Sequence, residues 1–423
     1  MSDLRGKKLL ILAGASLHCK VVKAARDMGV HTIVTDYLPP SSSPAKLMAD
    51  ESWMLSITDV DAIIEKCKTE GVDGVLNFCI DPAQVPYQKI ASRLGLPCYG
   101  TQEQFFVLTN KPAFKAFCRK CGLDTIPEYS EEDIREDRVQ YPVFVKPADS
   151  RGSRGQSICY SKAEAANAIP VAKEASGSGE VVIEKFMGDK QDFSMTYFVC
   201  DGVPYLTRTC DRHMGRPEDN LSKQCIAAIS PSRYSDFYME KVDAKVREFI
   251  KALGLQNGPV FMQGFIDGDT VRFYDPGLRF AGSQMELLLA QATGADLMSK
   301  MVEFALTGAF DASSLRDDLY KLNGMSSVQL YITSRPGTIG KYVGLEKIKA
   351  DPAVRSVFTR YEAGAEVPGS GDIRQRVCDI GLPIGPNESM KEVVSRIQST
   401  FDVLDQDGAS MLVSPLRLEL LDD

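Results

Sequence analysis

The chain has 423 residues, 44% of them hydrophobic, and a formal net charge of -8 at pH 7. This length predicts roughly two to four domains, and the negative charge, without a basic stripe, argues against a nucleic-acid partner. No apolar run reaches the roughly 20 residues that span a bilayer, and no signal peptide precedes Lys7, so we expect no membrane partner and a cytoplasmic location. Eleven scattered cysteines fit a reducing compartment better than a disulfide framework.

The N-terminal part of the chain alternates predicted strands and helices. A strand from Lys8 to Ala13, a helix from about His18 to Met28 and a strand from His31 to Thr35 are typical of a doubly wound, Rossmann-like α/β domain. The turn at 14–16 lacks the full glycine fingerprint of a dinucleotide site. The pattern therefore predicts the fold of this part of the chain and does not favour NAD binding.

A strand, a lysine and a glycine-rich loop follow one another in the next part. Val143–Val145 reads as a strand, and Lys146 emerges at its end. Gly152 and Gly155 allow the following loop to turn tightly and to aim backbone N–H groups at an anion. The pattern predicts a loop that binds polyphosphate, with an ordinary solvated turn as the alternative. Further donors in the loop are Ser150, Arg151, Ser153 and Arg154.

A polar stretch from Cys210 to Lys223 separates two strand-like runs. We expect a long loop here, and long polar loops inside compact domains are commonly lids or binding loops. His213, Arg216 and Lys223 are its candidate substrate contacts. A solvated loop without a binding role is the alternative.

Downstream, the stretch Gly258–Gly282 predicts a hairpin whose turn is Asp267–Asp269. Antiparallel pairing would let Gln263 and Asp275 present oxygen atoms to one site, with Arg279 just beyond. Oxygen ligands combined with substrate phosphates are the usual way that proteins hold Mg²⁺. The hairpin is therefore a candidate metal site.

The order of these parts resembles the ATP-grasp superfamily along nearly the whole chain. The resemblance implies an α/β ATP-grasp fold with a Rossmann-like N-terminal domain at 1–108, a nucleotide-binding domain of two subdomains at 109–312, and a C-terminal α+β domain at 313–423. The layout of the C-terminal part, from the strand-like Val328–Thr333 to a helix at Ser389–Phe401, resembles that of L-amino acid ligases. A carbamoyl phosphate synthase-like branch is the other resemblance.

The resemblance also implies roles for individual residues, with ATP and Mg²⁺ or Mn²⁺ as cofactors. Lys111 and Lys146 would contact phosphates, and the loop 150–155 would close over them. Arg279 and Lys146 would be catalytic, with Arg279 facing an acyl phosphate. The other implied contacts are Glu184, Lys185 and Phe186 for adenine, Asp192 for the ribose, and Gln263 and Asp275 for the metal.

Two departures weaken the implied metal site. Gln263 offers a neutral oxygen where the family has a carboxylate, and Gly277 replaces a frequent asparagine ligand. Together they remove one charge and one ligand, so we expect weaker binding of a divalent ion than is usual in the family.

The resulting expectation is an ATP-dependent carboxylate–amine ligase, acting as a homodimer on a small acid and an amine. The alternatives are a nucleotide-binding regulatory protein without turnover and an enzyme of carbamoyl phosphate synthase-like chemistry. Gly14, Ser16 and Asp81 are candidate substrate residues of the first domain, with turn and helix-cap roles as the alternative. The sequence does not identify the acid or the amine.

Overall fold

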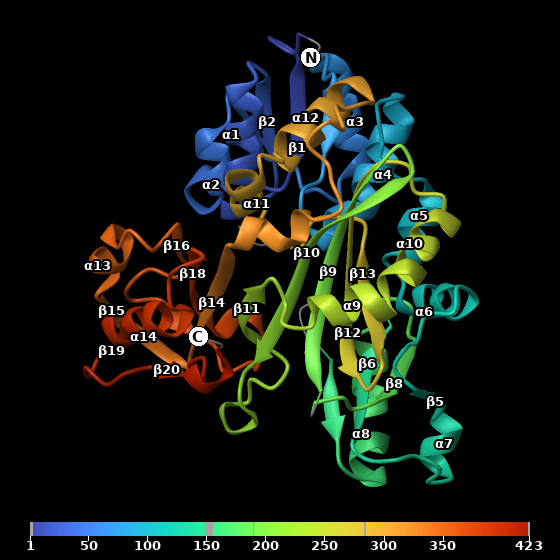
Figure 1. Ribbon diagram of the computed structural model, residues 1–423, viewed down its shortest axis with the longest axis vertical. Coiled ribbons are helices and arrows are strands. Elements are labelled where there is room, and N and C mark those ends of the chain that lie inside the picture. Colours follow the sequence, from blue (N-terminus) through green and yellow to red (C-terminus); the bar gives the residue numbers. More distant parts are fainter. Residues whose placement is uncertain (1–2, 149–154, 189, 283–284, 422–423) are drawn as a thin grey trace.

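The computed structural model describes residues 3–148, 155–188, 190–282 and 285–421, and its arrangement is shown in Figure 1. The N-terminal part forms a four-stranded parallel sheet in the order β3-β2-β1-β4. Its strands are β1 (Lys8–Leu12), β2 (His31–Thr35), β3 (Glu51–Trp53) and β4 (Gly74–Leu76), and its main helices are α1 (Cys19–Asp27), α2 (Pro44–Met48), α3 (Val60–Glu70) and α4 (Gln84–Leu94).

A small antiparallel sheet with its own apolar core forms the second unit. Its strands run in the order β5-β8-β6-β7, and helix α8 (Lys162–Glu174) packs on it. The strands are β5 (Glu128–Tyr129), β6 (Val143–Pro147), β7 (Ser157–Cys159) and β8 (Val181–Lys185), and the short helix α7 is Glu131–Arg135.

A nine-stranded sheet forms the body of the molecule, in the order β13-β12-β9-β10-β11-β14-β18-β16 with β20 paired to β14. It crosses the domain boundary expected at 312, because β11 pairs with β14. Its strands are β9 (Gln191–Cys200), β10 (Val203–Met214), β11 (Cys225–Ser230), β12 (Gly258–Asp267), β13 (Thr270–Gly277), β14 (Ser326–Ser334), β16 (Ser356–Thr359), β18 (Arg376–Ile384) and β20 (Leu412–Val413).

The remaining elements surround these sheets. A three-stranded sheet, β17-β15-β19, belongs to the C-terminal part. Its strands are β15 (Gly337–Val343), β17 (Glu366–Val367) and β19 (Asp402–Asp405). The other helices are α5 (Gln102–Val107), α6 (Lys111–Lys120), α9 (Ser235–Lys241), α10 (Asp243–Ala252), α11 (Met285–Thr293), α12 (Leu297–Thr307), α13 (Leu345–Ala350) and α14 (Met390–Thr400), and the short 3₁₀ turns are η1 (Ser16–His18), η2 (Pro40–Ser42), η3 (Asp81–Ala83), η4 (Pro217–Asp219), η5 (Leu319–Gly324), η6 (Ile373–Gln375) and η7 (Leu418–Leu420).

The chain returns to the N-terminal sheet after the hairpin β12-β13. Helix α12 lies beside the blue N-terminal strands in Figure 1 and packs on α1 and β4. The approach is close, because a Cβ atom at Gly74 would lie 2.4 Å from the carbonyl oxygen of Ala305. One apolar core therefore joins the N-terminal sheet to the long strands that carry the site.

The expected long loop at Cys210–Lys223 is wrong in its first half. Strand β10 continues to Met214, paired with β9 on one side and β11 on the other, so only 215–224 connects the strands. Charge misled the prediction, because Asp211 and Arg212 are satisfied by partners on neighbouring segments.

Two further expectations concern membrane segments and cysteines. No helix in the described ranges is long and apolar enough to cross a membrane. All eleven cysteines lie in those ranges and none forms a disulfide.

Candidate functional site

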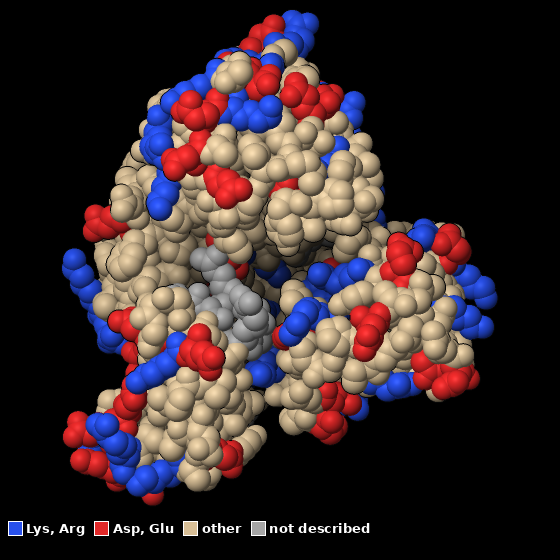
Figure 2. Space-filling model, turned by 180° about the vertical axis from the view of Figure 1, so that it is seen from behind, with Lys and Arg blue, Asp and Glu red and all other residues tan. Residues whose placement is uncertain are grey.

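A cavity of about 360 Å³ opens between the small antiparallel sheet and the nine-stranded sheet. Figure 2 shows the molecule hollowed near its centre, with Lys and Arg side chains at the rim. The cavity brings together residues from α6, both β-sheets and the hairpin β12-β13. Expected site residues on its wall are Asp81, Lys111, Lys146, Glu184, Lys185, Phe186, Asp192, Lys223, Gln263 and Asp275.

Lys146 is held at the end of β6 by a buried carboxylate. Its Nζ lies 2.6 Å from Glu184 Oε2 on the neighbouring strand β8, and Glu184 also binds Lys115 of α6. Burial, with Lys115 and Lys111 nearby, lowers the pKa of Lys146 well below its ordinary value, and burial lowers the pKa of Lys115 to about 8. An anion entering the cavity would favour the charged form of Lys146.

The resemblance assigned the adenine contact to the backbone of this strand, and the Glu184 side chain has a separate role. The carboxylate is almost fully buried and is occupied by the two lysines. Around it the cavity wall is apolar, which suits the faces of a planar ring. Apolar residues on this wall include Ile126, Phe144, Phe186, Met187, Met214 and Phe265.

The hairpin forms as expected, and Gln263 and Asp275 are direct cross-strand partners. Lys111 Nζ lies 3.6 Å from Asp275 Oδ1. With the Gln263 amide turned to satisfy its neighbours, its oxygen accepts from Nη1 and Nε of Arg212 at 2.8 and 3.2 Å. Asp275 is thus the better metal ligand of the two, and the described residues hold no cluster of three or more His, Cys, Asp or Glu side chains around a possible ion.

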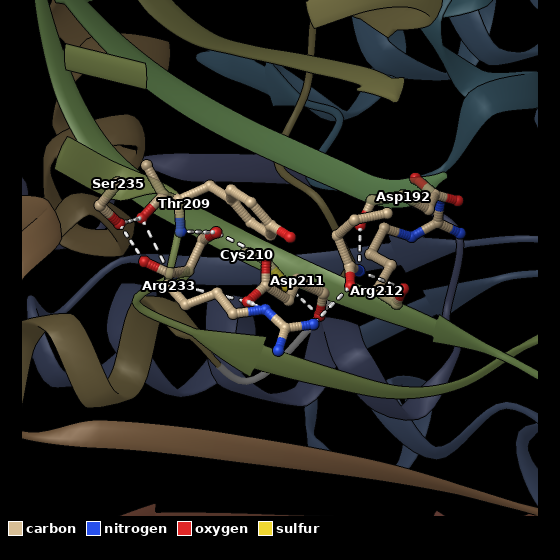
Figure 3. A network of polar contacts seen from close by, with 10 residues as sticks. Asp192, Thr209, Cys210, Asp211, Arg212, Arg233 and Ser235 are labelled. Atoms are coloured by element: carbon tan, nitrogen blue, oxygen red, sulfur yellow. Dashed lines mark hydrogen bonds and ion pairs between the residues drawn. The ribbon is translucent and has the colours of Figure 1, made fainter. Parts of the chain in front are cut away.

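Asp192, expected at the ribose, is tied into a polar network (Figure 3). Arg212 donates to its carboxylate at 2.7 Å, and the Tyr274 hydroxyl donates at 3.0 Å. Burial raises the pKa of Asp192, and the guanidinium opposes that rise. On β10, the strand of Arg212, the side chains of Thr209 and Asp211 instead make hydrogen bonds to the segment that carries Arg233 and Ser235 (Figure 3).

A second cavity, of about 500 Å³, adjoins the first. Its floor crosses the nine-stranded sheet from β12 to β16, and the turn after β1 forms part of its roof. Arg279 lies on its wall, paired with Asp81 of the N-terminal part. Five residues belong to the walls of both cavities: Arg212, Cys225, Gln263, Ile373 and Arg376.

The structure separates the candidate substrate residues. Ser16 lines the second cavity and Lys223 the first, where its Nζ donates to the carbonyl of Gln156 at 3.0 Å. His213 and Arg216 line neither cavity, because β10 turns His213 to the opposite side from Arg212. Burial lowers the pKa of His213 to about 4.

Two glycine expectations end differently. Gly14 is a structural turn, since its N–H donates to Asp36 and a Cβ there would meet Ser43 Oγ at 1.9 Å. Gly155 has a positive φ of 68° at the end of the predicted phosphate loop. The loop residues Ser150, Arg151, Gly152, Ser153 and Arg154 lie outside the described residues.

The cavity residues that sequence reasoning missed include Arg208, Arg212, Arg360, Arg376 and Tyr274. A signal for the first two was available. Arg208 and Arg212 stand an even number of residues apart, so on a strand they share one face. The predicted loop began at Cys210, so it separated Arg212 from Arg208 and concealed that periodicity.

Residues 113–236 match the family described as "Carbamoyl-phosphate synthase L chain, ATP binding domain". The chain is 23% identical over 337 residues to the formate-dependent phosphoribosylglycinamide formyltransferase of Wolinella succinogenes, covering 72% of this chain and 81% of that protein.

Two solved structures are similar along nearly their whole length. They are the L-amino acid ligase of Bacillus licheniformis, with a TM-score of 0.78, 19% identity, and 95% and 99% of the two chains covered, and the biotin carboxylase domain dimer of Hydrogenobacter thermophilus 2-oxoglutarate carboxylase, crystallised with MgADP, with a TM-score of 0.74, 18% identity, and 96% and 91% covered. The predicted fold is confirmed.

Proposed function

Because this chain has the ATP-grasp fold, we propose that it is an ATP-dependent ligase that joins a carboxylic acid to an amine through an acyl phosphate. One observation carries the proposal: a cavity lined by lysines that can hold phosphates shares a wall with a second, arginine-lined cavity. ATP in the first and an acid in the second would meet at that wall. The similarity to an L-amino acid ligase supports this choice of reaction.

The chemistry divides between the two cavities. An oxygen of the acid forms a bond to the γ-phosphorus of ATP, and the bond from phosphorus to the bridging oxygen breaks, releasing ADP. The amine then forms the C–N bond, phosphate leaves, and the amine loses a proton. Lys111 and Lys146 would balance negative charge on the phosphates, and Arg279 would hold the acyl phosphate oxygens.

The donor set partly fits a divalent ion. Asp275 offers a carboxylate at the phosphate end of the cavity, whereas the Gln263 oxygen is shared with Arg212. Bound there, Mg²⁺ or Mn²⁺ would supply charge neutralisation of the phosphates. Asp275 would hold the ion, with phosphate oxygens and water completing its ligands.

The single carboxylate at the metal site favours the second candidate, a nucleotide-binding regulatory protein without turnover. A site with one carboxylate binds metal nucleotide more weakly than a site with two. Carbamoyl phosphate synthase-like chemistry is a third candidate, and bicarbonate-stimulated hydrolysis of ATP would reveal it.

ADP release in the presence of a panel of acids and amines tests the proposal. We expect release to require both an acid and an amine, and Lys146→Ala to abolish it and to weaken ATP binding. ADP release with neither co-substrate, or none with any pair, would count against a ligase. Unchanged ATP affinity in folded Lys146→Ala would contradict the assigned role of that lysine.

The assembly and location are also part of the proposal. The biotin carboxylase domain from Hydrogenobacter thermophilus is a dimer in its crystal structure, which supports a homodimer for this chain. Light scattering on the purified chain would measure its mass. Cell fractionation would test the cytoplasmic location expected from the sequence.

A further inference from the structure

The second cavity is more positive than one carboxylate requires. Its wall carries five arginines and one carboxylate, Asp379, which pairs with both Arg360 and Arg376. Two further arginines, Arg212 and Arg279, pair with Asp192 and Asp81. Within the described residues, two positive charges are therefore left without a carboxylate.

One of those charges is Arg208, in the middle of the sheet. Arg208 is only 7% exposed, and no carboxylate of the described chain lies within ion-pair distance of it. Its Nε makes a long hydrogen bond of 3.4 Å to Ser230 Oγ. A guanidinium stays charged at any physiological pH, and an unpaired charge away from water is costly. An anion from outside the chain would balance this charge.

Two unpartnered hydroxyls lie on the same face of the sheet. Ser194 and Thr196 of β9 are buried, and neither hydroxyl has a hydrogen-bond partner within the part of the chain that the structure describes. Ser194 lines the cavity, and Thr196 is the cross-strand partner of Arg208. Buried hydroxyls normally have partners, and a ligand atom in the cavity would give one to Ser194.

The position of Arg208 separates it from the reacting end. Arg208, Arg279 and Arg360 all line the second cavity and not the first, and Arg208 differs from Arg279 by its place on β10 in the middle of the sheet. Arg279 lies over Phe261, which shares a cross-strand row with Thr196 and Arg208. Strands β12 and β10 are two strand spacings apart, which is about 10 Å. Two anionic groups of one small molecule can thus reach Arg279 and the region of Arg208 together.

We propose that the acid substrate carries a second anionic group, and that Arg208 and Ser194 bind it while Arg279 faces the reacting carboxylate. The proposal rests on the ligase function above. The second group is a carboxylate or a phosphate, since both accept from a guanidinium and a hydroxyl.

Matched pairs of acids test the proposal on the full chain by calorimetry, with Mg²⁺ and a non-hydrolysable ATP analogue present. The pairs are succinate with butyrate, glutarate with pentanoate, and 3-phosphoglycerate with glycerate. We expect one or more dianions to bind about tenfold to a hundredfold tighter than the partner lacking the second charge. The pair that shows the difference identifies carboxylate or phosphate.

Arg208→Met should bring the ratio of the two affinities within each pair close to one, and Ser194→Ala should lower that ratio. The control is Arg233→Met, an arginine near β10 that lines neither cavity, which should keep the ratio. Arg208→Met should unfold at the same temperature or higher, because it removes an unpaired charge. If Arg208→Met does not fold, Arg208→Gln and Ser194→Ala answer the question.

Equal binding within every pair in the natural protein, or an unchanged ratio in folded Arg208→Met, would overturn the second anionic group. Discrimination in binding without ADP release in any acid and amine mixture would overturn the ligase reaction and leave this subsite standing. ADP release with equal kcat/KM for both members of every pair would support the ligase reaction and overturn the second anionic group.

Discussion

The charged residues of the two cavities are arranged in pairs and triads, and the spare charges mark the places for substrates. Glu184 holds both Lys115 and Lys146, so the Nζ of Lys146 is positioned at the end of β6 before any nucleotide arrives, and the anion favours its charged form. Such fixed cations need no rearrangement when charge develops in a transition state. In the proposed function, the excess of arginine at the second cavity would serve binding of the acid in the same way.

Residue exchange in the hairpin tests which side chain holds the metal. Asp275→Asn should weaken binding of Mg²⁺–ADP by about tenfold or more and abolish ADP release, because it removes the carboxylate that the hairpin presents to the cavity. Gln263→Glu should tighten binding by less than about tenfold, because Arg212 takes part of the new charge. Metal titrations of nucleotide affinity measure both effects. No change in either variant would mean that the hairpin does not hold the ion.

At the scale of elements, local pattern predicted the strands and helices well where apolar runs were clear. The strands β1 and β2, the helix that follows β1, and the hairpin β12-β13 all follow from alternation and turn residues. The last half of β10 did not, because its polar side chains pair with residues far away in the sequence. The candidate site could be predicted only where one strand or loop supplied it. Arg208 on β10 and Arg376 on β18 come from strands far apart in the sequence, and the sheet brings both to the wall of the second cavity.

A glycine exchange next to β6 tests how backbone geometry supports Lys146. Gly155→Ala should destabilise the chain by roughly 1 to 3 kcal/mol more than Gly179→Ala. Both glycines have positive φ, 68° and 74°, but a Cβ at Gly155 would lie 2.5 Å from Ala175 Cβ, whereas nothing lies within 4 Å at Gly179. Denaturant unfolding measures the difference. Equal losses would mean that the segment relaxes freely.

The far face of β10 gives the molecule a dependence on acid. Burial lowers the pKa of His213 to about 4, below the ordinary value of 6.5, with Arg233 and Arg417 adding to the shift. The unfolded chain therefore binds the proton first, so stability is complete above pH 6.5 and falls as the pH drops toward 4. The loss should reach about 1.4 kcal/mol per pH unit from this group. His213→Phe should reduce the slope of unfolding free energy against pH between 6.5 and 4. An unchanged slope would mean that the His213 side chain is exposed to water.

At the scale of the whole molecule, the nine-stranded sheet unites segments that the sequence divides. The C-terminal part supplies β14, β18 and β16 to the same sheet as the hairpin, and with them Arg376 at the wall between the cavities. The N-terminal part supplies Asp81 to Arg279. The second cavity therefore combines residues from both ends of the chain, which no local sequence pattern reveals.

A chain ending at residue 312 tests this unity. It would leave β11 at the edge of the sheet without its partner β14, exposing the buried residues Ile226, Ala227 and Ile229. An unpaired apolar edge strand is a template for association, so we expect the fragment to aggregate, or to unfold at a temperature well below that of the full chain. Co-expression with the fragment 313–423 should restore a soluble complex, because the missing strand and the second core return together. Light scattering and thermal unfolding measure both outcomes. A monodisperse fragment 1–312 that unfolds at the temperature of the full chain would show that the first 312 residues are stable without the strands that complete the sheet.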